Sequence, residues 1–191
     1  DLSLEWYYDE GSYAALAYFR KDIDGYLGYN TLPETVVVPS GSYEYEISRP
    51  INESSTEVDG FEFAVQHMFT TLPEPFDGLG VIFNVTKVDS SSEQDDLPLI
   101  GLGDSENLIL FYEKAGFQVR LAYNNRGRFM QTKPVVTGTR QRDGHYVDDY
   151  KQLDLSGSYD INENFTVFFE GINLTNELTV KNAEYKNQTL Q

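Results

Sequence analysis

The sequence predicts an all-β protein, an antiparallel up-and-down meander of about eight strands that forms a segment of a transmembrane β-barrel. Runs of alternating apolar and polar residues are joined in pairs by tight turns, near residues 9–11, 72–77, 114–116 and 160–164. Much longer polar segments separate the pairs, at 21–56, 89–107, 125–149 and from 175 onward. This order places every short turn at one end of the sheet and every long loop at the other. Such asymmetry is typical of barrels whose short turns face the periplasm.

Composition excludes several other classes of protein. No apolar run approaches the roughly 18–20 residues of a membrane-spanning helix, whereas a spanning strand needs only about 9–11 residues with alternate ones apolar. The net charge of -17, from 14 basic and 31 acidic residues, argues against nucleic-acid binding. The chain has no cysteine, and therefore no disulfide and no thiolate metal ligand. Its 191 residues suit one large domain or two small ones.

The first two hairpins are predicted from four runs. In the first run, over 2–8, every second residue belongs to one face: Leu2, Leu4, Trp6 and Tyr8. The second, over 12–20, is apolar on both faces, so its orientation stays open. The third, over 61–69, places these side chains together: Phe61, Phe63, Val65, His67 and Phe69. The fourth, over 79–86, does the same with Leu79, Val81, Phe83 and Val85.

The last two hairpins follow the same rule. Residues 107–113 form a short and ambiguous run, and 117–124 alternate clearly between Phe117, Val119, Leu121 and Tyr123 and a polar face. Residues 152–159 place Leu153, Leu155 and Tyr159 opposite Gln152, Asp154, Ser156 and Ser158. The run 165–174 is apolar on both faces, and its orientation also stays open.

The polar face separates a barrel from a soluble sandwich. Its residues are mostly Gln, Asn, Ser and Gly with a few charges, as in a wet lumen opposite lipid. Several tyrosines near strand ends suit an aromatic girdle at the membrane surface: Tyr8, Tyr112, Tyr123, Tyr150 and Tyr159. The alternative is a soluble β-sandwich with tyrosine-rich edges, acting as a carbohydrate-binding module.

Four stretches in order resemble the C-terminal barrel of TonB-dependent outer-membrane receptors, in the branch often linked to carbohydrate uptake. Residues 58–66, VDGFEFAVQ, resemble the family's "G-x-E" strand, and 76–86, FDGLGVIFNVT, resemble the "L-D-G-L-G … N-x-T" strand. Residues 112–124, YEKAGFQVRLAYN, are similar to the "Y-E-K-x-G-F-x-x-R-x-x-Y-N" hairpin. Residues 152–177 resemble the penultimate hairpin with its "N-L-T-(D/N)-E" ending.

The resemblance implies the cell outer membrane as location and active transport as function. The family's barrel has 22 strands, so 1–191 is expected to be a partial barrel domain that lacks the plug domain and the final strand. Implied partners are outer-membrane lipid and lipopolysaccharide, a small-molecule or oligosaccharide substrate, and an energy-transducing inner-membrane complex that acts through the missing plug. The substrate is expected to be an oligosaccharide, with an iron chelate as rival. Unpaired edges of a partial barrel are expected to close into a smaller barrel or to pair between copies.

Substrate contacts are predicted in the long loops. The loop charges are uneven, at -4 over 21–56, -6 over 89–107 and +2 over 125–149. Arginine binds phosphate or carboxylate through paired hydrogen bonds, and exposed tyrosines provide rigid area for stacking on a sugar. The alternatives, arginines paired with neighbouring acidic loops and tyrosines that anchor loops to one another, stay open. The candidate residues are Tyr43, Tyr45, Arg126, Arg128, Arg140, Arg142 and Tyr146.

No catalytic residue, metal site or cofactor is predicted. His67 belongs to an apolar strand face, and His145 lacks a serine or carboxylate at a diagnostic spacing. An acidic cluster lacks the spacing of a calcium loop: Glu93, Asp95, Asp96 and Asp104. The sequence therefore favours a transport or binding protein over an enzyme.

Overall fold

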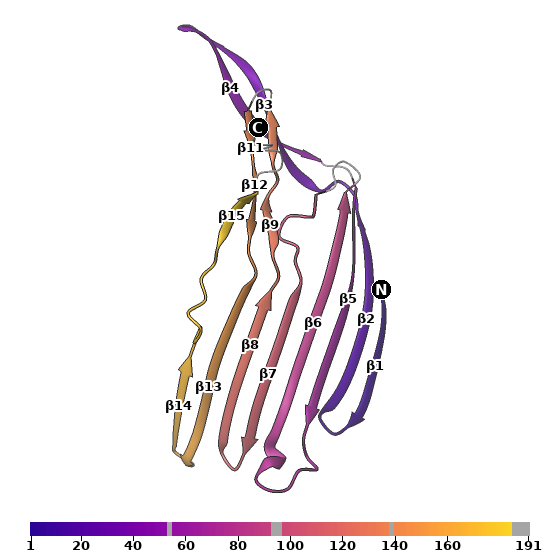
Figure 1. The fold of residues 1–191 in the computed structure, drawn as a ribbon, viewed down its shortest axis with the longest axis vertical. Coiled ribbons are helices and arrows are strands. Elements are labelled where there is room, and N and C mark those ends of the chain that lie inside the picture. The colour runs from indigo at the N-terminus through magenta and orange to yellow at the C-terminus, as the bar shows by residue number, and fades with distance from the viewer. Residues whose placement is uncertain (53–54, 93–96, 138–139, 185–191) are drawn as a thin grey trace, which may run out of the picture.

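An eight-stranded antiparallel sheet dominates the computed structural model, which describes residues 1–52, 55–92, 97–137 and 140–184 (Figure 1). Its strand order is β1-β2-β5-β6-β7-β8-β13-β14, so strands adjacent in the sheet follow one another along the chain apart from insertions. The bounds are β1 Leu2–Asp9, β2 Ser12–Ile23, β5 Thr56–Met68, β6 Leu79–Ser92, β7 Ser105–Lys114, β8 Phe117–Arg126, β13 Tyr150–Asn162 and β14 Phe165–Gly171. The predicted meander of eight strands is confirmed.

The two ends of this sheet differ, as the turn and loop lengths predict. The β1–β2, β7–β8 and β13–β14 turns lie at the lower end in Figure 1, together with the β5–β6 connection and its short 3-10 helix, η1 (Phe76–Gly78). The long connections lie at the upper end (Figure 1). We refer below to the turn end and the loop end of the sheet.

Strand register sorts the side chains into one apolar and one polar face. Residues paired across an antiparallel sheet point to the same side, so a row of partners identifies a face. One row across seven strands is apolar throughout: Trp6, Ala14, Val65, Phe83, Leu108, Tyr123 and Leu153. The adjacent row is mostly small or polar: Glu5, Ala15, Ala64, Asn84, Asn107, Asn124 and Gln152. Adjacent rows face opposite sides because the pleat has a period of two.

Register also gives the orientation of the two strands that the sequence leaves open. In β2, Leu16 pairs with Phe63 and therefore lies on the apolar face. In β14, Val167 pairs with Tyr159 on the apolar face, whereas Glu170 pairs with Ser156 on the polar face. Both strands carry apolar residues on the polar face as well, which hides their alternation in the sequence.

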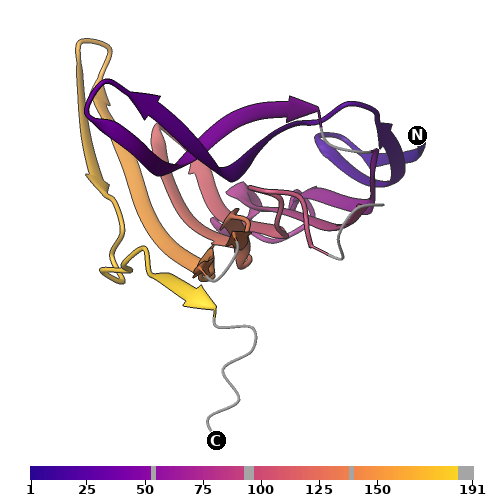
Figure 2. The ribbon, with the colours of Figure 1, turned by 90° about the horizontal axis from the view of Figure 1, so that it is seen from above.

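The apolar face is convex and uncovered. Figures 1 and 2 show the sheet curved like a trough, open on the side opposite the viewer of Figure 1. Leu4 on β1 is 71% exposed and Phe63 on β5 is 40% exposed. The buried apolar residues that the structure describes are few: Val58, Phe111, Met130, Tyr146 and Val147. A soluble sandwich would cover its apolar face with a second sheet, and the described residues contain no such layer. The described residues also include no helix long and apolar enough to cross a membrane.

The predicted long loops contain strands, which is a correction. Segment 21–56 holds a hairpin of two twelve-residue strands, β3 (Leu27–Val38) and β4 (Gly41–Asn52). Three short strands form a second sheet: β9 (Phe129–Thr132), β12 (Gly144–Val147) and β15 (Lys181–Glu184). A further pair is β10 (Val135–Thr137) with β11 (Arg140–Arg142). β4 does alternate, with Tyr43, Tyr45 and Ile47 opposite a polar face, whereas polar residues, Gly28 and Pro33 interrupt the pattern in β3.

The eight-stranded sheet does not close on itself. β1 and β14 are its two edges and do not pair with each other, so the expectation of closure into a smaller barrel is wrong for this chain. Seen from above, the β3–β4 hairpin crosses over the open side of the trough (Figure 2), and it rises beyond the loop end in Figure 1. Pairing of the two free edges between copies stays a prediction.

Candidate binding site at the loop end of the sheet

A cavity of about 370 Å³ lies at the loop end. Five parts of the chain line it: the upper end of β6, the segment before β7, the β8–β9 connection, β9 and β12. Its residues are Val88, Asp89, Ser90, Pro98, Leu102, Gly103, Asp104, Gly127, Arg128, Phe129, Met130 and Tyr146. Two of the predicted substrate contacts, Arg128 and Tyr146, therefore meet here.

Backbone hydrogen bonds fold the segment before β7 over the cavity. The Leu99 N–H donates to Ser90 Oγ at 2.8 Å, which ties this segment to β6. The Gly101 N–H donates to the Met130 carbonyl at 2.8 Å, which ties it to β9. Met130 lies beneath these contacts with no exposed surface. Two hydrogen bonds, one to β6 and one to β9, thus fix the segment before β7 over the cavity.

Gly127 allows a close approach of two chain segments. Its N–H donates to the Asp104 carbonyl at 2.8 Å, and an added Cβ would lie 3.1 Å from the Asp104 Cβ. The adjacent Asp104 carboxylate accepts a hydrogen bond from the Val88 N–H at 3.1 Å. A side chain at position 127 would push this wall of the cavity outward.

Two arginines flank Gly127, and each stacks on an aromatic ring. The Arg126 guanidinium carbon lies 3.9 Å from the centre of the Phe129 ring, and its Nη2 donates to the Gly101 carbonyl at 2.9 Å. The Arg128 carbon lies 4.0 Å from the centre of the Tyr146 ring, and its Nε is 3.7 Å from Asp148 Oδ1. Stacking on a ring fixes the plane of each guanidinium.

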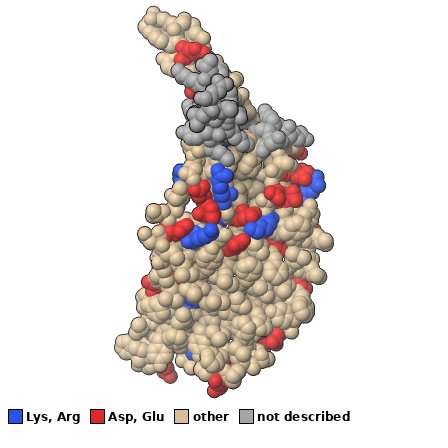
Figure 3. Space-filling model, viewed as in Figure 1, with Lys and Arg blue, Asp and Glu red and all other residues tan. Residues whose placement is uncertain are grey.

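Charged residues form a band on the convex face at the loop end. Lys87 Nζ lies 3.0 Å from Asp104 Oδ2 and 3.1 Å from Glu106 Oε1. Arg20 pairs with Glu57 in the same band. Asp149, between β12 and β13, accepts a hydrogen bond from Lys151 Nζ, which lowers the pKa of Asp149 below its usual value. Figure 3 shows acidic and basic side chains gathered across the upper part of this face, above a surface with few charges.

Aromatic side chains gather at the opposite, turn end of the apolar face. The ring centres of Tyr8 and His67 are 5.7 Å apart, and those of His67 and Phe69 are 4.7 Å apart. The Phe117 ring is 5.9 Å from that of Tyr112 and 6.3 Å from that of Tyr159. These rings form a girdle next to the turns, and Tyr8, Tyr112 and Tyr159 occupy the positions predicted for it.

Tyr43 and Tyr45 are not among the residues that line the cavity. Tyr43 and Tyr45 are on β4, 46% and 52% exposed. Arg140 and Arg142 are on β11, and their side chains lie outside the described residues. Sequence reasoning missed Ser90, Phe129 and Met130, which line the cavity. The R-G-R-F run at 126–129 was an available signal, because alternating arginine and glycine before an aromatic residue suits a close, stacked turn.

In the described part of the chain, no three His, Asp or Glu side chains lie close enough together to hold a metal ion. Of the acidic cluster considered for calcium, Glu93, Asp95 and Asp96 lie outside the described residues. His67 packs between Tyr8 and Phe69, with its Nδ1 3.1 Å from the Tyr8 hydroxyl. His145 Nδ1 lies 2.9 Å from Thr132 Oγ1 within the short second sheet.

Comparison with known proteins gives one match. A family model described as TonB dependent receptor-like, beta-barrel, matches residues 1–174. No curated protein and no solved structure shows significant similarity to the chain. The matched range covers the whole eight-stranded sheet, and it ends three residues after β14.

Proposed function

We propose a transport role for this chain, which belongs to the family of TonB-dependent receptor β-barrels. In this proposal it forms part of the pore wall of an outer-membrane active transporter and contributes external loops that capture substrate. Proteins of this family are outer-membrane transporters and not enzymes. The observation that supports this role best is the sheet itself, with an uncovered apolar face, a polar face and all long connections at one end. A barrel wall between lipid and a wet pore requires that combination.

The two ends of the apolar face suggest where the membrane lies. The aromatic girdle marks the turn end, and the band of ion pairs marks the loop end. Between them the convex face is apolar over most of each strand, from Leu79 to Val85 on β6 and from Phe117 to Tyr123 on β8. An apolar band about 25 Å tall between two interfaces is the usual pattern of outer-membrane barrels. Lipid and lipopolysaccharide are the partners proposed for this face.

The loop-end cavity is the proposed place of substrate capture. Arg128 and Tyr146 line it, and Arg126 braces the segment that closes it. Tyr43 and Tyr45 lie two residues apart on β4, so they share one face of the hairpin that crosses the open side of the trough. A ring-stacked arginine at the cavity wall and exposed tyrosines on β4 suit a polyhydroxylated ligand. We propose an oligosaccharide as substrate, with an iron chelate as the rival.

Energy for transport is proposed to come from an inner-membrane complex that acts through a plug domain. The polar concave face is the surface that such a plug would contact. Self-association of the chain through β1 and β14 is proposed for the protein on its own, because both edges present unpaired backbone groups.

The first test is the solution behaviour of the 191-residue chain. Size-exclusion chromatography with light scattering, with and without detergent, should give a defined species in detergent and aggregates or discrete oligomers without it. A clean aqueous monomer would contradict the membrane role and return attention to a soluble sugar-binding module. Binding of neutral oligosaccharides and of a ferric chelate is then compared in detergent, with Tyr43→Ala, Tyr45→Ala and Arg128→Ala as variants and Tyr29→Ala, on the other face of the hairpin, as control.

A further inference from the structure

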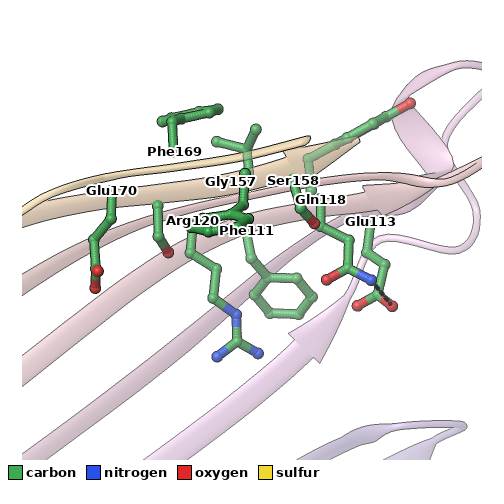
Figure 4. Close-up of a pocket in the computed structure, with 12 residues that line it drawn as sticks. Phe111, Glu113, Gln118, Arg120, Gly157, Ser158, Phe169 and Glu170 are labelled. Atoms are coloured by element: carbon green, nitrogen blue, oxygen red, sulfur yellow. Dashed lines mark hydrogen bonds between the residues drawn. The ribbon is translucent and has the colours of Figure 1, made fainter. Parts of the chain in front are cut away.

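A second cavity, of about 290 Å³, lies on the sheet itself, away from the loop-end site. Strands β7, β8, β13 and β14 line it. Cross-strand pairing places Phe111, Arg120, Ser156 and Glu170 in one row on the polar face. Figure 4 shows Phe111, Arg120, Gln118, Glu113 and Glu170 on one side of the strands and Phe169 on the other. The cavity therefore opens toward the concave side of the trough.

Arg120 is a cation without a carboxylate partner among the residues that the structure describes. The contact recorded for it is with Phe111, whose ring centre lies 5.9 Å from the guanidinium carbon. Phe111 is itself almost fully buried, since it lies over Gly80 of the next strand. The Arg120 side chain thus lies beside the buried Phe111 ring, and its donor groups remain free to bind a ligand.

The residues between Arg120 and Glu170 leave space for a ligand. Ser156 separates them in the row, and Ser158 pairs with Gln118 in the next row on the same face. Two strand spacings put the Arg120 and Glu170 backbones roughly 10 Å apart, and the two side chains, both described by the structure, form no ion pair with each other. Short hydroxyl side chains on the floor add hydrogen-bonding groups without filling the volume.

We propose that this cavity is a binding position for a carboxylate group, held by the Arg120 guanidinium and the hydroxyl of Ser156. Arginine pairs with carboxylates through two parallel hydrogen bonds, and the contact with Phe111 helps to hold the Arg120 side chain over the cavity. Glu170 repels the charge of the ligand from the far side, which places the carboxylate at the Arg120 end. The carboxylate belongs either to a free solute, such as an acidic sugar, or to an acidic side chain of a polypeptide inside the pore.

The test uses the full chain in detergent with ¹⁵N-labelled arginine. The chain has seven arginines, and the Nε–H signal of Arg120 is assigned by its loss in Arg120→Lys. Glucuronate and glucose are the probes, since they differ in having a carboxylate or a hydroxymethyl group at one carbon. Glucuronate should shift the Arg120 signal to saturation and glucose should not. Equal shifts with both sugars would overturn the proposal.

Two variants and a control check the geometry through glucuronate affinity measured calorimetrically. Arg120→Gln should weaken glucuronate binding by about tenfold or more, because a charge-assisted hydrogen bond is lost. Glu170→Gln, on an exposed edge strand where folding is not at risk, should strengthen it, because a like charge is removed. Arg20→Lys, on the convex face, should leave affinity unchanged. Unchanged affinity in both Arg120→Gln and Glu170→Gln would contradict the assignment.

A blocked Gly-Asp-Gly tripeptide distinguishes the two sources of carboxylate. If the tripeptide shifts the Arg120 signal and glucuronate does not, the site receives a polypeptide side chain. If glucuronate shifts it, the site takes a free acidic solute. If neither does, the proposal fails. The readout is independent of oligosaccharide capture at the loops, because loop variants such as Tyr43→Ala leave Arg120 and its neighbours in place.

Discussion

The guanidinium carbon of Arg128 lies 4.0 Å from the centre of the Tyr146 ring, and this stack forms one wall of the loop-end cavity. Tyr146 is only 9% exposed, so its ring serves as a support for the arginine and offers little surface for stacking on a ligand. The two residues belong to the β8–β9 connection and to β12. Their contact therefore joins two separate loop segments at the proposed capture site.

Arg128 and Tyr146 are expected to be energetically coupled. In a double-mutant cycle with Arg128→Met and Tyr146→Leu, the coupling free energy of unfolding should be about 0.5–1 kcal/mol, the usual strength of a partly exposed cation–π contact. Urea titration in detergent, followed by fluorescence, measures the four proteins. Tyr146→Phe keeps the ring and serves as the control. Additive effects of the two substitutions would mean that the stack contributes nothing.

Gly80 and Phe111 are expected to behave as a complementary pair. A Cβ at position 80 would lie 2.2 Å from Phe111 Cζ, so Gly80→Val should reduce the free energy of unfolding by about 1–3 kcal/mol through overpacking. Combining it with Phe111→Ala should recover part of that loss. Ala64→Val, on the same polar face, is the matched control. If Phe111→Ala worsens the effect of Gly80→Val, the ring does not lie over this glycine.

Two neighbouring positions on β5 should differ strongly in how much an introduced charge reduces stability. Phe63 lies on the apolar face and Ala64 on the polar face. Phe63→Arg should reduce the stability of the protein folded into lipid vesicles by about 2–4 kcal/mol, the cost of arginine on the lipid face near mid-membrane. Ala64→Arg should cost much less, because its side chain reaches water. Urea unfolding from vesicles compares them, and equal costs would contradict a membrane-facing convex surface.

The turn-end ion pair should make stability depend on acid pH. Lys114 Nζ donates to Asp77 Oδ1 at 2.6 Å, and this hydrogen bond lowers the pKa of Asp77 below its usual value. A lowered carboxyl pKa stabilises the folded state at pH values above the unfolded pKa of about 3.9, and this stabilisation disappears as pH falls through the folded pKa. Asp77→Asn should therefore lower Tm slightly at pH 7 and not at pH 2.

A matched substitution isolates that pair in the same melting experiments. Glu74 also lies 3.2 Å from Lys114 Nζ, but its side chain is 85% exposed, so Glu74→Gln should change Tm less than Asp77→Asn. Curves for the native chain and Asp77→Asn that stay parallel from pH 7 to pH 2 would show that the Asp77 charge does not stabilise the turn.

Much of the sheet could be predicted from the sequence, because the alternation of side chains along a strand and the short turns between strands are local features of the sequence. Alternation with a period of two identifies the face of a strand wherever one side meets lipid and the other meets water, as along Phe61–Val65 and Phe117–Tyr123. Short turns between such runs imply antiparallel neighbours in order. The eight strands of the main sheet, the faces of those that alternate clearly and the separation of turn end from loop end follow from these two facts, and the structure confirms them. The faces of β2 and β14 needed the register.

The tertiary structure decided what depends on contacts between distant segments. The β3–β4 hairpin forms by backbone pairing between two strands inside one long polar segment, and the alternation of β4 alone does not reveal that pairing. The loop-end cavity exists because residues 97–104 fold onto β6 and β9, which brings Ser90, Met130 and Tyr146 together across more than one loop. The place of Arg120 between Phe111 and Ser156 depends on the register of three strands. Sequence patterns report the environment of each residue, whereas a binding site depends on which residues meet, and that is settled by pairing and packing.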